Sequence, residues 1–220
     1  MPSWHSHHGL KTRILQPTTR SLRASNNMPR GAKQKQERSS REDWLREALE
    51  LLGEMGISSI TIDALCNRLG LTKGSFYWHF SGRQELLSAM VERYASTHPL
   101  EIRERLEQSG LDDWGQLQQL SQEAYEKYAR IDHAMRIWAE DSEETLEAVK
   151  QSDAKTLRFH EQKLKAMGVP LKKARPIARL ILCASLGYSF ARPSLGGKKE
   201  YDEMGPLIKS LIDLEIQAKN

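Results

Sequence analysis

Residues 61–86, TIDALCNRLGLTKGSFYWHFSGRQEL, constrain the fold of this chain more than any other segment. Apolar residues recur at helical spacing in its first half, and Gly70 follows them where a residue without a Cβ most easily ends a helix. Thr72 is the expected N-cap of a second helix from Lys73 to about Phe80. Two short helices around such a turn predict a helix-turn-helix, whose second helix enters the major groove of DNA.

The second of these expected helices has two different faces. Phe76 and Phe80 are expected to point into the core. The outward face combines one cation, short hydrogen-bonding groups and flat rings, contributed by Lys73, Ser75, Tyr77, Trp78 and His79. Such a set suits the base edges and phosphates of a major groove. For Trp78 a second interpretation stays open, namely a core anchor against the following helix.

A longer ordered set of residues surrounds this motif between Trp44 and Val91. It comprises Ala48, Leu51, Leu52, Gly56, Thr61, Asp63, Gly70, Thr72, Lys73, Gly74, Tyr77, Phe80 and Leu86. This set resembles the DNA-binding domain of the tetracycline-repressor (TetR) family of bacterial transcriptional regulators. The chain departs from the family pattern at Ile60, Cys66, Leu69, Arg83 and Gln84, where Thr, Ala, a small residue and Lys-Glu are frequent.

The resemblance and the residue types together predict the DNA contacts. The expected contact residues are Thr61, Thr72, Lys73, Gly74, Ser75, Tyr77, Trp78, His79 and Arg83. Thr61, Thr72 and Arg83 stand at expected helix starts, where hydroxyls, backbone N–H groups and a cation bind phosphates. Lys73 and Ser75 are expected to face base edges. Because the module repeats in a dimer, the expected target is a palindromic operator in double-stranded DNA.

The periodicity predicts an all-α fold. Together with the resemblance, it implies an N-terminal three-helix helix-turn-helix DNA-binding domain and a C-terminal helical ligand-binding and dimerisation domain. We divide the chain into a disordered basic arm (residues 1–39), the DNA-binding domain (residues 40–90) and the effector-binding and dimerisation domain (residues 91–220). Ser39 and Glu42 have the spacing of a capping box at the start of the first helix.

Further helix boundaries are expected from apolar spacing, glycine and proline. One long helix passes through Leu117 and Ile131, with a separate short helix from His133 to Ala139. Three others are expected from Glu143 to Met167, from Ile177 to Phe190 and from Pro206 to Ala218, with a loop over residues 192–199. The second of these three is expected to be buried on most of its circumference and is too short in its apolar part to span a bilayer.

Charge and cysteine content narrow the cellular context. The net charge is +4, and the first 40 residues carry eight Lys and Arg against one Glu, so the arm would add sequence-independent attraction to DNA. The two cysteines, Cys66 and Cys183, lie in apolar helical patterns, which favours a reducing cytoplasm over a disulfide framework. Translation from Met28 rather than Met1 is also compatible with the arm.

The C-terminal part is expected to carry an effector pocket and a homodimer interface. The resemblance, combined with large apolar side chains and two histidines as a polar lining, predicts a pocket. Its expected residues are Tyr125, Tyr128, His133, Met135, Trp138, Phe159, His160 and Met167. For His133 and His160 the alternative of hydrogen-bonded core histidines stays open. Two apolar helices near the C-terminus predict a homodimer interface, as the resemblance also implies. The expected interface residues are Leu182, Leu186, Leu207, Ile208, Leu211 and Ile212.

No catalytic, cofactor or metal motif emerges from the sequence, so we expect a protein that is not an enzyme. Two functions are compared. The first is a dimeric repressor that a small-molecule effector releases from its operator, acting in the cytoplasm without a membrane partner. The second is a DNA-bound regulator or architectural protein whose C-terminal domain only dimerises or recruits a protein partner. An enclosed pocket that a compound occupies would distinguish the two.

Overall fold

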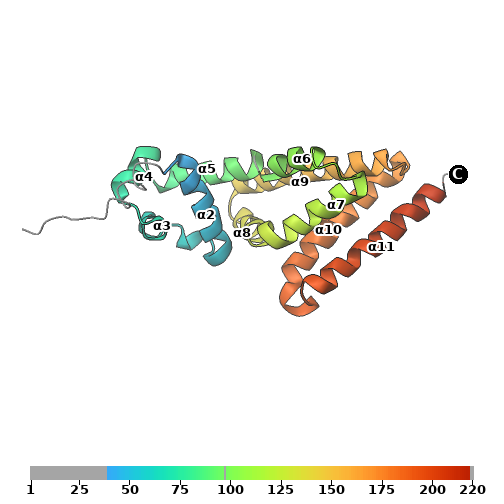
Figure 1. The fold of residues 1–220 in the computed structure, drawn as a ribbon. Helices are drawn as coiled ribbons and strands as arrows, with labels where there is room; N and C mark the ends of the chain where they lie inside the picture. The colour runs from blue at the N-terminus through green and yellow to red at the C-terminus, as the bar shows by residue number, and fades with distance from the viewer. Residues whose placement is uncertain (1–38, 97, 219–220) are drawn as a thin grey trace, which may run out of the picture.

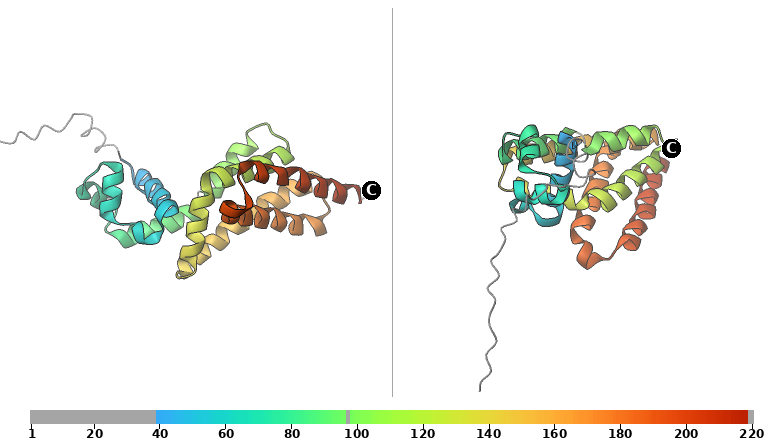
Figure 2. Two further views of the ribbon diagram at one scale, coloured as in Figure 1. Left: turned by 90° about the horizontal axis from the view of Figure 1, so that it is seen from below. Right: turned by 60° about the vertical axis from the view of Figure 1, so that its left-hand side comes forward.

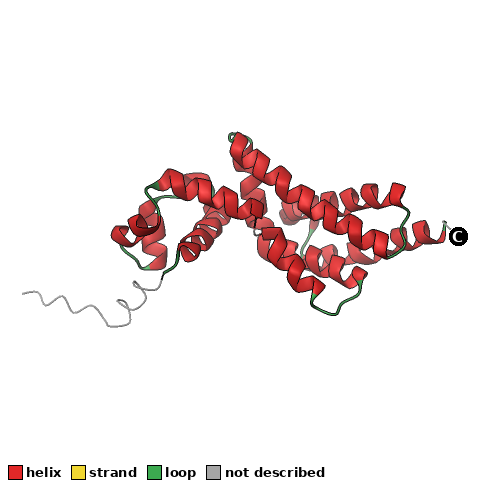
Figure 3. Cartoon of the chain, turned by 90° about the horizontal axis from the view of Figure 1, so that it is seen from above, coloured by secondary structure: helices red, strands yellow, loops and turns green. Residues whose placement is uncertain are grey.

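The computed structural model describes residues 39–96 and 98–218, with residues 98–101 and 192–193 described by their backbone alone. Within these ranges the chain is helical and contains no strand, which confirms the all-α class (Figure 3). The predicted arm lies outside the described residues apart from Ser39, and so do Met1 and Met28.

The helices form two groups joined by α5. In chain order they are α2 (Arg41–Met55), η1 (Ile57–Ser59), α3 (Ile62–Leu69), α4 (Lys73–His79), α5 (Arg83–Ser96), α6 (His98–Glu107), α7 (Asp113–Glu123), η2 (Ala124–Tyr128), α8 (Ala129–Ala139), α9 (Glu143–Ala166), α10 (Leu171–Leu195) and α11 (Lys198–Gln217). Figure 1 shows α2, α3 and α4 at one end, with α5 leading from them to the remaining helices. The described C-terminal helix runs along α10 and ends far from α3 and α4 (Figure 2).

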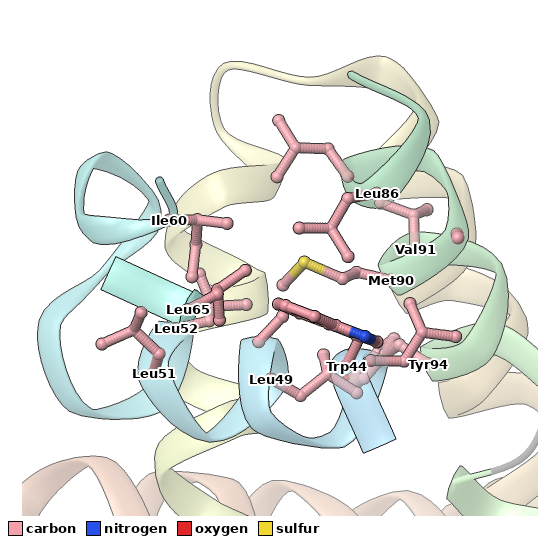
Figure 4. Packing of buried hydrophobic residues seen from close by; sticks show 14 of the residues in the cluster. Trp44, Leu49, Leu51, Leu52, Ile60, Leu65, Leu86, Met90, Val91 and Tyr94 are labelled. Atoms are coloured by element: carbon pink, nitrogen blue, oxygen red, sulfur yellow. The ribbon is translucent and has the colours of Figure 1, made fainter. Parts of the chain in front are cut away.

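The first core, as we call it, fills the space between α2, α3, α4 and α5. Its buried side chains include Trp44, Leu52, Ile60, Leu65, Phe76, Phe80, Leu86, Met90 and Tyr94. Figure 4 shows Trp44 and Met90 lying against each other among these residues. Ile131, Met135 and Ala139 of α8 and Ala148 and Val149 of α9 belong to the same cluster. The boundary predicted after residue 90 therefore lies inside α5, and the first core includes residues from beyond it.

Gly53 explains how closely α2 can approach α8. A Cβ at this position would lie 3.1 Å from the backbone nitrogen of Ile131 and 3.2 Å from the carbonyl carbon of Arg130. Both atoms belong to the backbone and cannot rotate away. Only a glycine therefore allows this separation of the two helices without displacement.

A second core lies between α6, α7, α9, α10 and α11. Its buried residues include Ile102, Leu106, Leu117, Leu120, Phe159, Leu164, Ile177, Ile181 and Ile212. Helix α9 takes part in both cores, with Val149 in the first and Phe159 in the second. None of the described helices is long and apolar enough to cross a membrane.

Local helix signals in the first group are mostly confirmed, with one correction. Gly70 has φ +67° after α3, in the left-handed region that ends a helix at least cost for glycine. The capping box of α2 is formed by Ser40 and Asp43 rather than by Ser39 and Glu42. The Asp43 carboxylate accepts from the Ser40 backbone N–H at 2.9 Å, which fixes the helix start one residue later than predicted.

The second group departs further from the prediction. No break precedes His133, because α7 continues through the π-helical segment η2 into α8. Helix α10 extends to Leu195, so most of the expected loop is helical. Gly196 at φ +102° ends α10, and the Glu200 carboxylate accepts from the Gly197 N–H at 2.8 Å to begin α11. Helix α11 thus starts before Pro206, which lies inside it.

Candidate nucleic-acid interface

Helix α4 is held by a cap and two buried rings. The Thr72 hydroxyl oxygen accepts a hydrogen bond from the Ser75 N–H at 3.3 Å. Phe76 and Phe80 are buried, as predicted, and their rings stack at a centroid distance of 5.4 Å. Trp44 of α2 meets Phe76 edge-on at the same centroid distance. The short helix is therefore fixed in rotation and position by the first core.

The opposite face of α4 is open to solvent. Trp78 is 86% exposed and Tyr77 is 55% exposed, and the residues Lys73 and Gly74 of the first turn are also exposed. The interpretation of Trp78 as a core anchor is therefore wrong. An indole costs free energy when left in water, so a side chain this exposed on a rigid helix is available to an external surface.

Lys73 is held across the helix-turn-helix by Asp63 of α3. The Lys73 Nζ lies 2.8 Å from an Asp63 carboxylate oxygen, and the two side chains are 59% and 69% exposed. The hydrogen bond to Asp63 raises the pKa of Lys73, so the ammonium stays charged. This pair presets the position of the cation and also competes with any phosphate or base for it.

The side chains of His79 and Ser75 are less exposed to solvent than that of Lys73. The His79 Nε2 is 2.9 Å from the backbone oxygen of Ser39, just before α2, and the ring is half-buried. Ser75 is half-buried as well. The structure thus gives His79 a partner inside the protein, linking the end of α4 to the start of α2, in place of the outward contact expected from sequence.

The other expected phosphate contacts lie at helix starts. The Thr61 hydroxyl oxygen accepts from the Ala64 N–H at 3.1 Å and caps α3. The Arg83 side chain donates through Nε to the Ile60 carbonyl at 2.5 Å and through Nη2 to the Ile57 carbonyl at 3.1 Å. Arg83 therefore fixes η1 to the start of α5, a role within the protein that its charge alone did not indicate.

Arg68 is a second positioning residue that sequence reasoning missed. Its Nε lies 2.5 Å from Glu47 and its Nη1 lies 2.5 Å from Glu54, both carboxylates of α2. The hydrogen bond to Glu54, and next the one to Glu47, raises the pKa of Arg68. The guanidinium thus joins α3 to α2. Glu47 and Glu54 lie 21 and 14 positions before Arg68, so no local sequence pattern indicates this pairing.

The predicted effector-pocket residues separate into several environments. Tyr128 and His160 line a cavity of about 80 Å³, here called the inner cavity. Tyr125 stacks on Tyr201 at 4.2 Å, and the ring of His133 meets Phe190 edge-on at 4.7 Å. The remaining four residues pack within the cores: Met135 and Trp138 in the first, Phe159 and Met167 in the second. Only two of the eight predicted residues therefore line the inner cavity.

The predicted dimer-interface residues are also divided. Ile212 is 0% exposed inside the single chain and cannot touch a partner, so its assignment is wrong. Leu182 and Leu186 line the inner cavity, Ile208 lines a neighbouring cavity, and Leu211 is half-buried. Leu207 is exposed. Other large apolar side chains on the outer faces of α10 and α11 are Leu180, Phe190, Leu195 and Leu214.

Helix α10 is accordingly not buried on most of its circumference within one chain. Leu180 is 49% exposed and Phe190 is 67% exposed, whereas Ile177 and Ile181 are buried in the second core. An apolar stripe in the sequence predicts that these side chains are removed from water. It does not indicate whether the same chain or another molecule covers them.

Comparison with known proteins connects these features to a family. Residues 45–90 match the model of the family described as bacterial regulatory proteins, tetR family. The HTH-type transcriptional regulator SrpR of Pseudomonas putida is 36% identical over 63 residues, which are 29% of each chain. The tetracycline repressor protein class C of Escherichia coli is 42% identical over 52 residues, 24% of each chain. The matched segment thus spans less than a third of the length of these relatives, one named as a transcriptional regulator and the other as a repressor.

Solved structures extend the similarity of fold over most of the chain. A TetR transcriptional regulator from Legionella pneumophila superposes with a TM-score of 0.67 at 12% identity, covering 79% of this chain and 97% of that one. A transcriptional regulator from Rhodococcus sp. Rha1 gives a TM-score of 0.63 at 18% identity, covering 82% and 97%. At these identities the likeness concerns the fold alone.

Proposed function

Through residues 45–90 this chain belongs to the tetR family of bacterial regulatory proteins, and we propose that it is a dimeric, sequence-specific DNA-binding regulator whose operator complex a small molecule dissociates. The observation that carries this proposal is the face of α4, where exposed Tyr77 and Trp78 stand beside the charged Lys73 on a helix anchored by buried Phe76. A bacterial regulator that binds DNA acts in the cytoplasm, where the chromosome lies.

Each exposed residue of α4 has its own part in the proposed complex. Lys73 donates hydrogen bonds to guanine acceptors in the major groove, either after its ion pair with Asp63 has broken or while it keeps that ion pair. Tyr77 donates its hydroxyl to a phosphate, which positions the helix without reading sequence. Trp78 places its indole against sugars or thymine methyl groups. Thr61, Thr72 and Gly74 let the backbone approach the phosphates, and Arg83 stiffens the start of α5 beneath them.

A gel-shift titration on an operator selected from random DNA tests the proposal. Lys73→Ala is expected to cost about 1–3 kcal/mol and to relax the preference at particular base pairs. Tyr77→Phe, which removes only the hydroxyl, should weaken all sequences equally. Met55→Ala, whose side chain is 68% exposed on α2, serves as the control and should bind as the unmodified protein does. Unaltered affinity in both α4 variants would exclude α4 as the DNA-reading helix.

Asp63 supplies a second test of the same surface. Asp63→Asn removes the negative charge that competes with DNA for Lys73, so affinity for any DNA should increase. The increase should shrink as salt concentration rises, because the added attraction is electrostatic. Decreased affinity would instead indicate that Asp63 positions Lys73 productively.

The dimer is proposed from the apolar outer faces of α10 and α11. Leu180 and Phe190 on α10 and Leu207 and Leu214 on α11 are each between 49% and 72% exposed in the single chain. Exposed leucines repeated along two long helices match the helix–helix seam of a symmetric homodimer. Two copies of α4 would then read the two halves of a palindromic operator.

Leu207→Arg tests this interface. Because Leu207 is 72% exposed, the substitution leaves the protomer core unchanged, yet it places an unpaired charge in the seam. Sedimentation velocity should then report monomers at concentrations where the unmodified protein and the control Met55→Arg are dimers. A dimeric Leu207→Arg variant would move the interface elsewhere.

The effector is proposed to bind among α6 to α10, where the inner cavity lies. Binding weakens the operator complex only if the ligand prefers the protein conformation that does not hold DNA. A coupling of about 1–3 kcal/mol would raise the operator dissociation constant roughly 5- to 150-fold. If compounds that occupy the cavity leave this constant unchanged, the second half of the molecule only dimerises or recruits a partner.

A further inference from the structure

His160 is a buried polar side chain without an adequate partner. It is 2% exposed, and neither ring nitrogen makes a hydrogen bond of normal geometry within the described chain. Burial lowers the pKa of His160 to about 4, and the nearby Ala178 carbonyl opposes this only partly. The ring is therefore uncharged at neutral pH. Because a neutral imidazole has only one N–H, the carbonyl can accept from one ring nitrogen, and the other nitrogen remains available to a ligand.

The inner cavity that His160 lines is apolar on one side and carries a paired charge cluster on the other. Leu182 and Leu186 form part of the apolar wall. Arg136 lies on the polar wall, donating through Nε to Asp132 at 2.9 Å and through Nη2 to Asp153 at 2.6 Å. One guanidinium against two carboxylates leaves this wall with one net negative charge.

A larger cavity lies next to the inner one. This outer cavity, of about 340 Å³, is bounded by α7, α10 and α11 and has Trp114, Leu117 and Ile181 among its apolar walls. Ser121 and Ser185 line both cavities, so the two cavities lie side by side between α7 and α10. The Tyr201 hydroxyl lies at their shared boundary, 2.9 Å from the Ser121 carbonyl oxygen and 3.3 Å from the Ser185 hydroxyl oxygen.

We propose that the two cavities form one binding site for an uncharged molecule with an extended apolar body and a terminal hydroxyl group, and that this hydroxyl exchanges hydrogen bonds with His160. The proposal deepens the effector site of the proposed function and rests on it. The hydroxyl occupies the inner cavity, and the apolar body passes Ser121 and Ser185 into the outer cavity.

The chemistry of the walls selects this class of ligand. A carboxylate would face the net negative charge of Asp132, Asp153 and Arg136 at short range. An ammonium would be attracted by the same charge, but it would have to leave water in the environment whose desolvation already keeps His160 unprotonated. A neutral hydroxyl both donates and accepts, as neutral imidazole does, and so can satisfy the available nitrogen. The inner cavity of about 80 Å³ corresponds to roughly three water molecules, too small for the apolar body.

The same cavity wall connects the ligand to the DNA-binding end. Asp132 accepts from Arg136 and from the hydroxyl of Tyr94, a buried residue of α5. Helix α5 begins directly after the loop that follows α4. A ligand that displaces Arg136 or Asp132 therefore changes a hydrogen bond of the helix that carries the DNA-reading unit.

Isothermal titration of the full chain with straight-chain alcohols tests both parts of the proposal. From 1-butanol to 1-octanol the affinity should rise about fourfold per methylene, because each buries apolar surface in the outer cavity. Affinity that stops rising at butanol would contradict a connected site. At equal chain length, octanoate and octylammonium should bind at least tenfold more weakly than 1-octanol. Equal or tighter binding of either ion would overturn the proposed ligand class.

A pair of histidine variants tests the role of His160. His160→Phe removes both nitrogens and should weaken 1-octanol binding about 3- to 10-fold, the range of one hydrogen bond. His133→Phe makes the same change where the ring packs on Phe190 outside both cavities, and should bind 1-octanol as the unmodified protein does. Circular dichroism checks that both variants are folded. Equal octanol affinity in folded His160→Phe would contradict the assignment of the hydroxyl to His160.

The operator titration separates this inference from the proposed function. If 1-octanol binds as described but leaves operator affinity unchanged, the site stands and the effector role fails. If the protein binds its operator and no alcohol binds, the proposed ligand class fails while the DNA-binding function stands.

Discussion

The two cores of this molecule are packed differently, although both are built from helices. Most of the largest fully buried side chains lie in the first core, among them Trp44, Phe76, Phe80, Met90 and Tyr94. The second core has Phe159 as its largest member, and the helices around it enclose the inner and outer cavities and leave His160 poorly partnered. The first core thus consists mainly of large side chains packed against one another, whereas the second region holds the inner and outer cavities beside a buried histidine. This difference suits the proposed division of the molecule into a DNA-reading surface and an effector site.

The largest expected effect concerns whether the first core depends on residues from the second half of the chain. Met135 of α8 is 0% exposed and belongs to the first core. Met135→Ala should lower the free energy of unfolding by about 2–5 kcal/mol in urea denaturation. Met55→Ala, at a side chain 68% exposed, should change it by less than about 0.5 kcal/mol. A Met135→Ala effect as small as the control would mean that the two ends are separate folding units.

The acid sensitivity of stability should come in part from the second region. The folded pKa of His160, about 4, lies below its usual value of 6.5, so the unfolded chain binds its proton first as pH falls. The resulting stability is fully present above about pH 6.5 and is lost toward pH 4, on the order of 3 kcal/mol. Denaturation at several pH values should show a smaller loss for His160→Phe than for His133→Phe. Equal losses would exclude His160 as the source.

Enlarging one small residue in each region compares their packing directly. Ala48 of the first core is 0% exposed, and Ala48→Leu should destabilise the protein by about 1–3 kcal/mol through overpacking. Ala184 lines the outer cavity, so Ala184→Leu can place its added carbons in existing space and should cost less than about 0.5 kcal/mol. Thermal unfolding measures both. A larger loss at position 184 would show that the outer cavity cannot accommodate added atoms.

The smallest expected effects are those of helix caps, which should be alike in both regions. Thr72 accepts from the Ser75 N–H at the start of α4, and Ser142 accepts from the Thr145 N–H at the start of α9. Replacing either by Ala should cost about 1 kcal/mol of stability. Only Thr72→Ala should also weaken operator binding, because α4 is the proposed reading helix. An equal loss of operator affinity in Ser142→Ala would contradict the assignment of α4 as the reading helix.

Local chemistry explains which parts of the structure the sequence predicts. Gly70 and Thr72 act on their own helix ends, and their effects follow from residue type and spacing alone. The salt bridge of Lys73 with Asp63 joins two helices, so it depends on how they pack. The same holds for Arg68, whose carboxylate partners lie on α2.

The errors in the second region have the same origin. Ile212 and Leu207 are both apolar on α11, yet one is fully buried in its own chain and the other is 72% exposed. Periodicity assigns both to an apolar face and cannot divide that face between an intramolecular core and a partner. Proline is frequent at the first position of a helix, which is why the sequence predicts a helix start at Pro206. The hydrogen bond from the Gly197 N–H to the Glu200 carboxylate instead marks a start before Pro206.

The close approach of α2 and α8 at Gly53 bears on how motion travels through the molecule. Between most packed helices, side chains form a layer that changes rotamer and absorbs small displacements before the neighbouring backbone moves. At Gly53 a Cβ would already be 3.1 Å from the Ile131 nitrogen, so that yielding layer is missing. Helix α8 also carries Asp132 and Arg136, which line the inner cavity. A shift of α8 at the cavity therefore reaches the backbone of α2 with little mechanical slack.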